Sequence, residues 1–355
     1  MISSKLSVVL GLLALPCARA TPYSMVYEYA GPSFFDGWDF YGNFDNLTNG
    51  DAIFVDSTQA EDLKLAYVND AGNAIIKVDN VSTVAFNEKR NTIRINSKDH
   101  FDVGSVWITD MLHVPFGCSV WPAWWSQAPN WPVGGEIDTF EGVNQVTMNQ
   151  MALHTEPGCT QASPVQSSTL VNSTDCSFQA NSNQGCVVTT PSTQSYGEGF
   201  AQAGGGMFVT EYASTGISIW FFSRSSIPSS LQGNASSIDT SQLGTPVANW
   251  PTGGCNIGNF FKPQSLIFDI TLCGDFAGNA ATFSQTCSGT CYNDYVVGKG
   301  STYDNAYFEV QYVRVYGANG QNTTISAAPM SISRPSTKAV AGVAAAAAAL
   351  GLASW

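Results

Sequence analysis

The chain has 355 residues, which is enough for one large domain or two ordinary ones. Charged residues make up 12% of it, against about 25% in an average globular protein, and the formal net charge is −13. This charge argues against a nucleic-acid partner, because binding phosphates requires Lys and Arg. An acidic surface also repels anionic lipid, so contact with a membrane would need a separate anchor.

Both ends of the chain carry patterns typical of processing signals. Residues 1–20 contain a lysine, an apolar run and an A-x-A site ending at Ala20, which predicts a secretory signal peptide. Residues 339–355 form an uncharged, alanine-rich tail behind a polar segment. With small residues at 326–328, this pattern predicts a glycolipid (GPI) anchor attached near 326–328; a transmembrane anchor or a disordered tail is the alternative. We therefore expect a secreted protein attached to the cell surface or cell wall.

Cysteine usage agrees with secretion. Of nine cysteines, only Cys17 lies in the predicted signal peptide, and an even number of remaining cysteines in a secreted chain predicts disulfides without deciding their pairing. A zinc site is disfavoured because the chain has no C-x-x-C pair, and we expect neither metal nor cofactor. The eight remaining cysteines are Cys118, Cys159, Cys176, Cys186, Cys255, Cys273, Cys287 and Cys291. Five glycosylation sequons begin at Asn46, Asn80, Asn172, Asn234 and Asn322.

Residues 21–318 predict a single all-β domain. Short alternating apolar runs occur at 91–96, 217–221, 266–272 and 307–316, separated by Gly, Asn, Pro and Ser. In the first of these runs, Ile93 and Ile95 share one face. Many short strands joined by polar turns favour a sandwich of two antiparallel sheets. Residues 319–338 are rich in Ser, Thr, Asn and Pro, which is typical of a stalk.

Three carboxylates lie close together between 131 and 144. On a regular strand Glu136 and Asp138 point to one face, about 6.6 Å apart at Cα, whereas Glu141 points to the other. One extra residue bulged out near Thr139 and Phe140 would bring all three to the same face. Two carboxyl groups about 5–5.5 Å apart are what retaining glycoside hydrolysis requires. An acidic turn in a loop, or a calcium site with three oxygen ligands, is the alternative.

Tryptophan is concentrated beside these acids, at Trp121, Trp124, Trp125 and Trp131. Indole faces stack on the apolar faces of sugar rings and need no charge on the ligand. Because tryptophan clusters also occur in cores, we expect at least one of the four to be buried for packing.

The sequence GEIDTFEG at 135–142 resembles the signature of glycoside hydrolase family 16, E-[ILV]-D-x-x-E. WPAWW at 121–125 and LHT at 153–155 resemble its fungal laminarinase-like branch, the endo-1,3(4)-β-glucanases, and the resemblance covers roughly 27–316. It implies a concanavalin-like β-jelly roll of two antiparallel sheets with an open concave cleft. It also implies retaining endo cleavage of β-1,3- or mixed β-1,3/1,4-glucan, and we expect a monomer.

The resemblance also assigns roles to individual residues. Glu136 would be the nucleophile, Glu141 the acid/base, and Asp138 the carboxylate that orients Glu136. Phe276 stands where related sequences often carry Trp, which puts one distal sugar site in doubt. Arg94 and His154 could instead form a plain salt bridge and a structural contact. The residues expected to bind substrate are Arg94, Trp124, Trp125, Trp131 and His154.

Two other functions remain open. One is a GPI-anchored cell-wall β-glucan transglycosylase of the same family, although plant-type transglycosylases usually carry the shorter E-x-D-x-E and the longer motif favours hydrolysis. The other is a non-catalytic β-glucan-binding protein. Such proteins typically lose one or more of the acids, and all three are present in this sequence.

Overall fold

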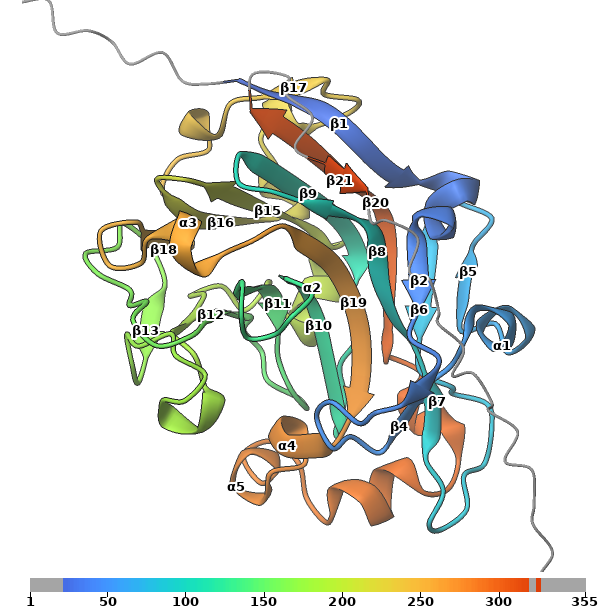
Figure 1. Cartoon of the computed structure of the whole chain (residues 1–355). Helices are drawn as coiled ribbons and strands as arrows, with labels where there is room; N and C mark the ends of the chain where they lie inside the picture. The colour runs from blue at the N-terminus through green and yellow to red at the C-terminus, as the bar shows by residue number, and fades with distance from the viewer. Residues whose placement is uncertain (1–21, 319–323, 327–355) are drawn as a thin grey trace, which may run out of the picture.

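The computed structural model describes residues 22–318 and 324–326, and most of its strands form two nine-stranded sheets (Figure 1). The predicted all-β sandwich of two antiparallel sheets is confirmed. The predicted signal peptide, the tail at 339–355 and Asn322 lie outside the described residues. Within the described part, no helix combines the length and the apolar character needed to cross a membrane.

Sheet A carries the longest strand of the fold. Its members are β1 (Tyr23–Ala30), β5 (Ala66–Val68), β6 (Ala74–Lys77), β9 (Ser105–His113), β15 (Gly206–Ala213), β16 (Gly216–Ser223), β17 (Ser237–Ile238), β18 (Ala248–Pro251) and β20 (Tyr307–Ala318). They lie in the order β17, β1, β20, β9, β15, β16, β18, with β6 paired to β20 and β5 to β6. Every pairing in this sheet is antiparallel.

Sheet B carries the acidic motif. Its members are β2 (Trp38–Phe40), β8 (Arg94–Phe101), β10 (Val120–Gln127), β11 (Glu136–Glu141), β12 (Gln150–His154), β13 (Thr169–Val171), β14 (Val187–Thr189), β19 (Gln264–Leu272) and β21 (Thr324–Ser326). The order is β13, β14, β12, β11, β10, β19, β8, β2, with β21 paired to β8. Strand β21 lies inside the predicted stalk, so that prediction is wrong for residues 324–326, whose backbone extends the sheet.

A third, small sheet and several short helices complete the fold. The sheet holds β3 (Asn43–Phe44), β4 (Ala52–Phe54) and β7 (Arg90–Thr92), with β4 and β7 parallel. The α-helices are α1 (Ser57–Asp62), α2 (Gly197–Gln202), α3 (Ile257–Phe260), α4 (Gly274–Ala277) and α5 (Ala280–Phe283). The 3-10 turns are η1 (Gly31–Gly37), η2 (Asn181–Asn183), η3 (Arg224–Ser226), η4 (Ser229–Leu231), η5 (Thr240–Gln242) and η7 (Gly300–Tyr303), and η6 (Tyr292–Val296) is a π turn.

Three of the four predicted strand segments lie within single strands, namely β16, β19 and β20. The fourth, at 91–96, is divided at Ile93 between β7 and β8, because the chain crosses there from the small sheet into sheet B. Ile93 and Ile95 are both fully buried, as their alternation predicted.

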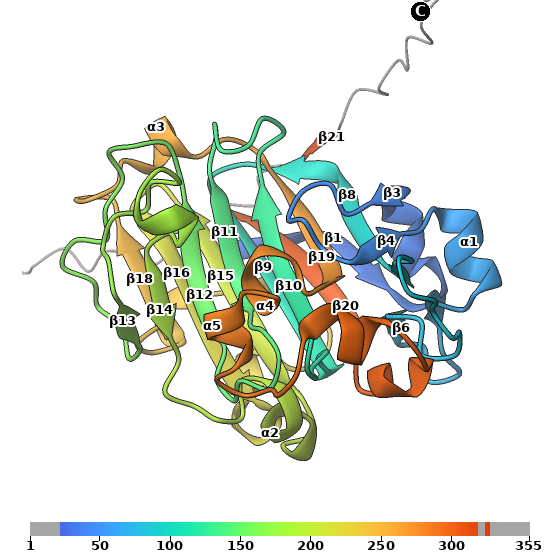
Figure 2. The same ribbon diagram turned by 90° about the horizontal axis from the view of Figure 1, so that it is seen from below.

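The main core fills the space between the two sheets, whose strands overlie each other in Figure 2. Phe140 on β11 reaches across it to Phe208 on β15 and Phe308 on β20, with ring centroids 5.7 and 5.8 Å apart. Burial of such apolar area is the main force that holds two sheets together. A second apolar cluster covers the other face of sheet A, where Leu231 and Leu243 pack near Trp220.

All eight cysteines pair, so the predicted disulfides are present and their connectivity is now defined. The bridges are Cys118–Cys287, Cys159–Cys255, Cys176–Cys186 and Cys273–Cys291.

Phe140 provides a test of this packing. Phe140→Ala should lower the free energy of unfolding by about 3–5 kcal/mol, because it removes a fully buried ring and leaves a cavity. Phe140→Leu should cost clearly less, since it keeps most of the volume. Denaturant melts of both variants measure the difference, and an unchanged midpoint for Phe140→Ala would contradict the packing described.

Candidate active site

A β-bulge in β11 places the three acids on one face of sheet B. Asp138 pairs with Ala152 and Glu141 with Gln150, so two residues of β11 stand opposite one residue of β12. Both bulged side chains, Thr139 and Phe140, are buried toward sheet A, where Thr139 Oγ1 shares a 2.6 Å hydrogen bond with Thr210 Oγ1. Glu136, Asp138 and Glu141 therefore share the face turned away from sheet A, here called the outer face, and the predicted bulge is confirmed.

A small side chain lies beside this motif on the neighbouring strand. In the strand register, Ala123 on β10 lies directly between Glu141 on β11 and Asp269 on β19. Trp121 and Trp125 lie two residues on either side of Ala123 and share the outer face, since side chains alternate along a strand. The small methyl group of Ala123 thus lies among carboxylates and indoles. An uncharged polar ligand such as a sugar can bind on a surface of this kind.

Glu141 is held at both carboxylate oxygens. Trp121 Nε1 donates to its Oε1 at 2.9 Å, and Gln150 Nε2 donates to its Oε2 at 2.8 Å. Burial raises the pKa of Glu141 above its ordinary value. The two hydrogen bonds act to lower the pKa but offset only part of this rise. Its backbone N–H also donates to Asn149 Oδ1 at 2.9 Å. The side chain is thus fixed in position and inclined to hold a proton.

Asp138 and His154 form a buried pair behind the two glutamates. His154 Nε2 lies 3.4 Å from Asp138 Oδ2. Burial, reinforced by the charge of Glu136, raises the pKa of Asp138 well above its ordinary value. Burial alone would lower the pKa of His154, but the charges of Glu136, Asp138 and Glu141 raise it to about 10. The imidazole therefore carries a positive charge at neutral pH, which offsets part of the surrounding negative charge.

Glu136 has a more open environment than Asp138. Its Oε2 accepts a hydrogen bond from the indole N–H of Trp131, whose side chain is 39% exposed. One oxygen each of Glu136 and Asp138 and one ring nitrogen of His154 lie within 4.8 Å of one another, the one group among the described residues with donors suited to a metal ion. A protonated His154 opposes that use, because a metal-binding imidazole must be neutral.

Arg94 lies beside the acids in a buried polar group. Its Nη1 donates to Asp269 Oδ2 at 3.0 Å, and its guanidinium lies 4.9 Å from the centroid of the Trp125 ring. Trp125 Nε1 donates to Asp269 Oδ1 at 3.2 Å. Burial raises the pKa of Asp269 to about 6, although Arg94 and Trp125 act to lower it. The salt bridge considered for Arg94 is thus present, on the same face as the three acids.

Trp124 does not lie with the other predicted substrate-binding residues. Its side chain is 1% exposed and stacks on Phe268 in the core, with ring centroids 4.2 Å apart. The prediction that Trp124 binds substrate is wrong, because alternation along β10 turns it toward sheet A. Of the four tryptophans near the acids, Trp124 is therefore the one that is buried for packing. Trp125, Trp131, Arg94 and His154 all lie by the acids.

Several site residues were missed by the sequence reasoning. Trp121 was noted but given no role, although its spacing of four residues from Trp125 already indicates the same face of a strand. Gln150 and Asp269 carry no local signal, since their place beside Glu141 and Arg94 depends on strand pairing.

The predicted glycosylation sites differ in their surroundings. Asn46, Asn172 and Asn234 are exposed, whereas Asn80 is half-buried and its Nδ2 donates to Asp304 Oδ1 at 2.7 Å. Glycosylation itself stays a prediction.

Comparison with known sequences agrees with the geometry. Residues 38–316 match the model of the XgeA-like, catalytic GH16 domain. A probable glycosidase of Schizosaccharomyces pombe is 40% identical over 85% of this chain and 71% of its own length. The endo-1,3(4)-β-glucanase xgeA of Emericella nidulans is 35% identical over 85% of this chain. The chain spans only about half, 48%, of that relative.

Solved structures give the same result. Laminarinase 16A from Phanerochaete chrysosporium, described with β-glucans in its donor and acceptor sites, superposes with a TM-score of 0.79 at 33% identity over 83% of this chain and 99% of its own. An elongating GH family 16 β-1,3-glucosyltransferase superposes with a TM-score of 0.77 at 36% identity, with the same coverage. Sequence motif, fold and site geometry converge, and the chain belongs to glycoside hydrolase family 16.

Proposed function

We propose that this protein hydrolyses β-1,3-glucan and mixed β-1,3/1,4-glucan at internal bonds, with retention of anomeric configuration. The observation that carries the proposal is the bulge in β11, which turns Glu136, Asp138 and Glu141 to one face. The names of the related proteins, endo-1,3(4)-β-glucanase and laminarinase, support this class of substrate. No cofactor is needed, because two carboxyl groups supply the nucleophile and the proton.

In the first step, a Glu136 oxygen attacks the anomeric carbon while the bond from that carbon to the leaving sugar oxygen breaks. Glu141 transfers its proton to the leaving oxygen, which departs as a hydroxyl. In the second step, Glu141 takes a proton from water, the water oxygen bonds to the anomeric carbon, and the ester to Glu136 breaks. Asp138, with its raised pKa, is suited to hold a proton and steady Glu136 between steps.

The assignment of roles can be tested by substitution. Glu136→Gln and Glu141→Gln should each lower kcat on laminarin by at least about 100-fold, because each removes the group that does the chemistry. Azide should restore turnover to Glu136→Ala and give a glycosyl azide of inverted configuration, since the small anion takes the nucleophile's place. Reducing-sugar release and NMR of the products measure these effects.

The matched control is Glu61→Gln, which makes the same change on the exposed surface of α1. It should leave kcat unaltered. Near-normal turnover in Glu136→Gln or Glu141→Gln would show that the residue has been assigned the wrong role.

The donors on Glu141 predict a change in pH dependence. Gln150 stabilises the charged form of Glu141, so Gln150→Met should raise the pKa of that carboxyl. The acid must be protonated to act, so kcat/KM falls as pH rises through this pKa, and the alkaline limb should move up by about one pH unit. The control is Gln202→Met, which removes an exposed Gln–Glu hydrogen bond within helix α2. An alkaline limb that stays in place, or moves down, contradicts the role of Gln150.

Transfer to a second sugar is the alternative outcome of the same intermediate. The similarity to an elongating β-1,3-glucosyltransferase, at 36% identity, is the observation that favours sugar transfer. Incubation of laminari-oligosaccharides with and without added acceptor separates the two, because hydrolysis yields shorter products and transfer yields longer ones. We expect shorter products to dominate. Binding to β-glucan with no released sugar would instead support a non-catalytic binding protein.

We also propose that the protein is secreted and held at the cell surface by a glycolipid anchor. The residue patterns at 1–20 and 326–355, together with the four disulfides, support this location. Treatment of cells that express the full chain with phosphatidylinositol-specific phospholipase C should release it into the medium. Retention on treated cells would contradict the glycolipid anchor.

A further inference from the structure

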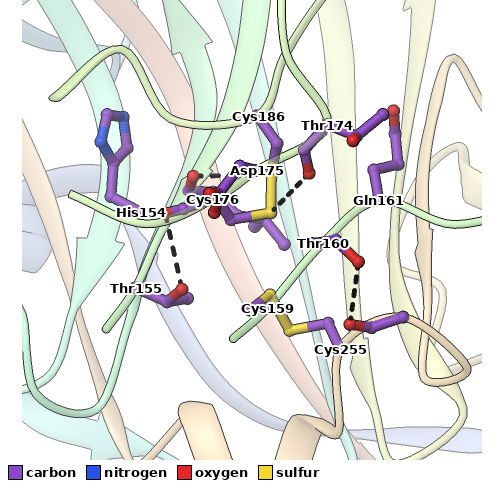
Figure 3. Close-up of a disulfide and its surroundings, with 12 residues drawn as sticks. His154, Thr155, Cys159, Thr160, Gln161, Thr174, Asp175, Cys176, Cys186 and Cys255 are labelled. Atoms are coloured by element: carbon purple, nitrogen blue, oxygen red, sulfur yellow. Dashed lines mark hydrogen bonds between the residues drawn. A yellow bond between two sulfur atoms is a disulfide. The ribbon is translucent and has the colours of Figure 1, made fainter. Parts of the chain in front are cut away.

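The segment that follows β12 folds back over His154. A disulfide between Cys176 and Cys186 closes it into a short loop, here called the 176–186 loop, and a second disulfide ties Cys159 to Cys255 (Figure 3). Cys186 N–H donates to Leu153 O at 3.3 Å, which fastens the end of the loop to β12 beside His154. None of these groups takes part in the chemistry proposed above.

One side chain of this loop reaches the imidazole. His154 Nδ1 lies 3.1 Å from Asn183 Oδ1, while its Nε2 faces Asp138 Oδ2. Both neighbours are oxygens, but only the Nδ1 contact is a hydrogen bond, and the Nε2 contact is an ion pair in which Asp138 Oδ2 has no hydrogen-bond partner among the described residues. Only the imidazolium form has two donors. An imidazolium, with an N–H at each ring nitrogen, therefore suits both contacts, and the Nδ1 hydrogen bond fixes the plane of the ring.

The loop backbone also contacts the ring. A Cβ atom added at Gly185 would lie 2.9 Å from both Cε1 and Nε2 of His154, so only glycine allows this close approach. His154 is 8% exposed as a result of being covered in this way. The ring thus lies between the 176–186 loop on one side and the three carboxylates on the other.

The backbone that carries Asn183 is strained. Asn181, Ser182 and Asn183 have φ values of 48°, 57° and 61°, in the left-handed region that non-glycine residues rarely adopt. Three consecutive residues of this kind persist only where surrounding structure holds them, and such strain gathers near functional sites. Here the disulfide closes the loop around the strained turn, and the turn aims Asn183 at His154.

A second residue of the loop contacts another partner of the acids. The Phe178 ring packs edge-on against Trp131, with centroids 5.7 Å apart, and the Trp131 indole donates to Glu136. The 176–186 loop therefore contacts the side-chain partners of both Glu136 and Asp138, although it carries no acid itself.

We propose that the 176–186 loop positions the catalytic carboxylates of this enzyme, and that Asn183 is a positioning residue acting through His154. This inference rests on the proposed function for its kinetic consequences. Asn183 orients the imidazolium, the imidazolium faces Asp138, and Asp138 in turn lies beside Glu136. Loss of the Asn183 contact frees the ring to turn, so the charge that balances the acids is no longer held in place.

Asn183→Gly tests the proposal, because glycine accepts the left-handed backbone and removes only the acceptor. We expect His154 to titrate at a pH about one unit lower, as seen by ¹⁵N NMR of the histidine rings, since a hydrogen bond to its charged form is lost. The chain has three histidines. The ring signal that is missing from the spectrum of His154→Gln is the signal of His154. On laminarin we expect kcat to fall about 10-fold with little change in KM.

Two further variants separate positioning from loop stability. Asn181→Gly makes the same change two residues away, relieves the same backbone strain and leaves the His154 contact intact, so it should behave as the unaltered chain. Asn183→Asp keeps an acceptor opposite Nδ1 and should preserve kcat. Thermal melts of the two glycine variants should show no loss of stability, because glycine removes backbone strain rather than packing.

The proposal is overturned if His154 titrates at the same pH in Asn183→Gly and in the unaltered chain. It is equally overturned if Asn181→Gly lowers kcat as much as Asn183→Gly does. The NMR titration needs no substrate. If the unaltered chain releases no sugar from laminarin, the proposed function fails, while the His154 titration still decides whether Asn183 sets the state of the ring.

Discussion

The packing of two adjacent side chains into the core is the constraint on which the site depends. A regular strand turns only every second side chain toward a given sheet, yet Thr139 and Phe140 both contact sheet A. The bulge that permits this also shifts the register by one, and so Glu141 faces the same side as Glu136 and Asp138. Hydrophobic burial on one face of β11 thereby fixes the arrangement of charges on the other. A strand without the bulge would direct Glu141 into the apolar core, at a large cost in free energy.

Electrostatics then gives the three similar acids different properties. Glu141 is enclosed by indole and amide donors, Asp138 is buried against a cationic His154, and Glu136 meets the partly exposed Trp131. Burial raises the pKa of Asp138 and Glu141, the charge of Glu136 adds to this rise, and the imidazolium limits how far it goes. These differences come from neighbours on β10, on β12 and on the connecting segment that carries Trp131, and they suit one carboxyl for attack and another for proton transfer.

Much of this arrangement could be predicted from local sequence, because β11 contains all three acids and the bulge within six residues. The strands at 217–221, 266–272 and 307–316 could be predicted for the same reason, since alternation is a local property. The prediction for Trp124 is wrong because alternation along β10, and not residue type, decides which face a side chain takes, and alternation separates Trp124 from Trp121 and Trp125. Gln150, Asp269 and Asn183 could not be found, because their roles arise from pairing and loop closure between distant segments.

The acids and the donors on Glu141 all reside on strands whose backbones are hydrogen-bonded to one another, whereas Trp131 and Asn183 reside on connecting segments. A change in a strand alters the register of its neighbours, but a connecting segment can lengthen or change composition without moving them. The strand register that aligns the three acids is therefore insulated from variation in these segments, while the contacts that the segments make with the neighbours of the acids and with differently linked or branched polymers are free to diverge. Descendants of one scaffold can in this way come to use new glucans without rebuilding the centre that cleaves them.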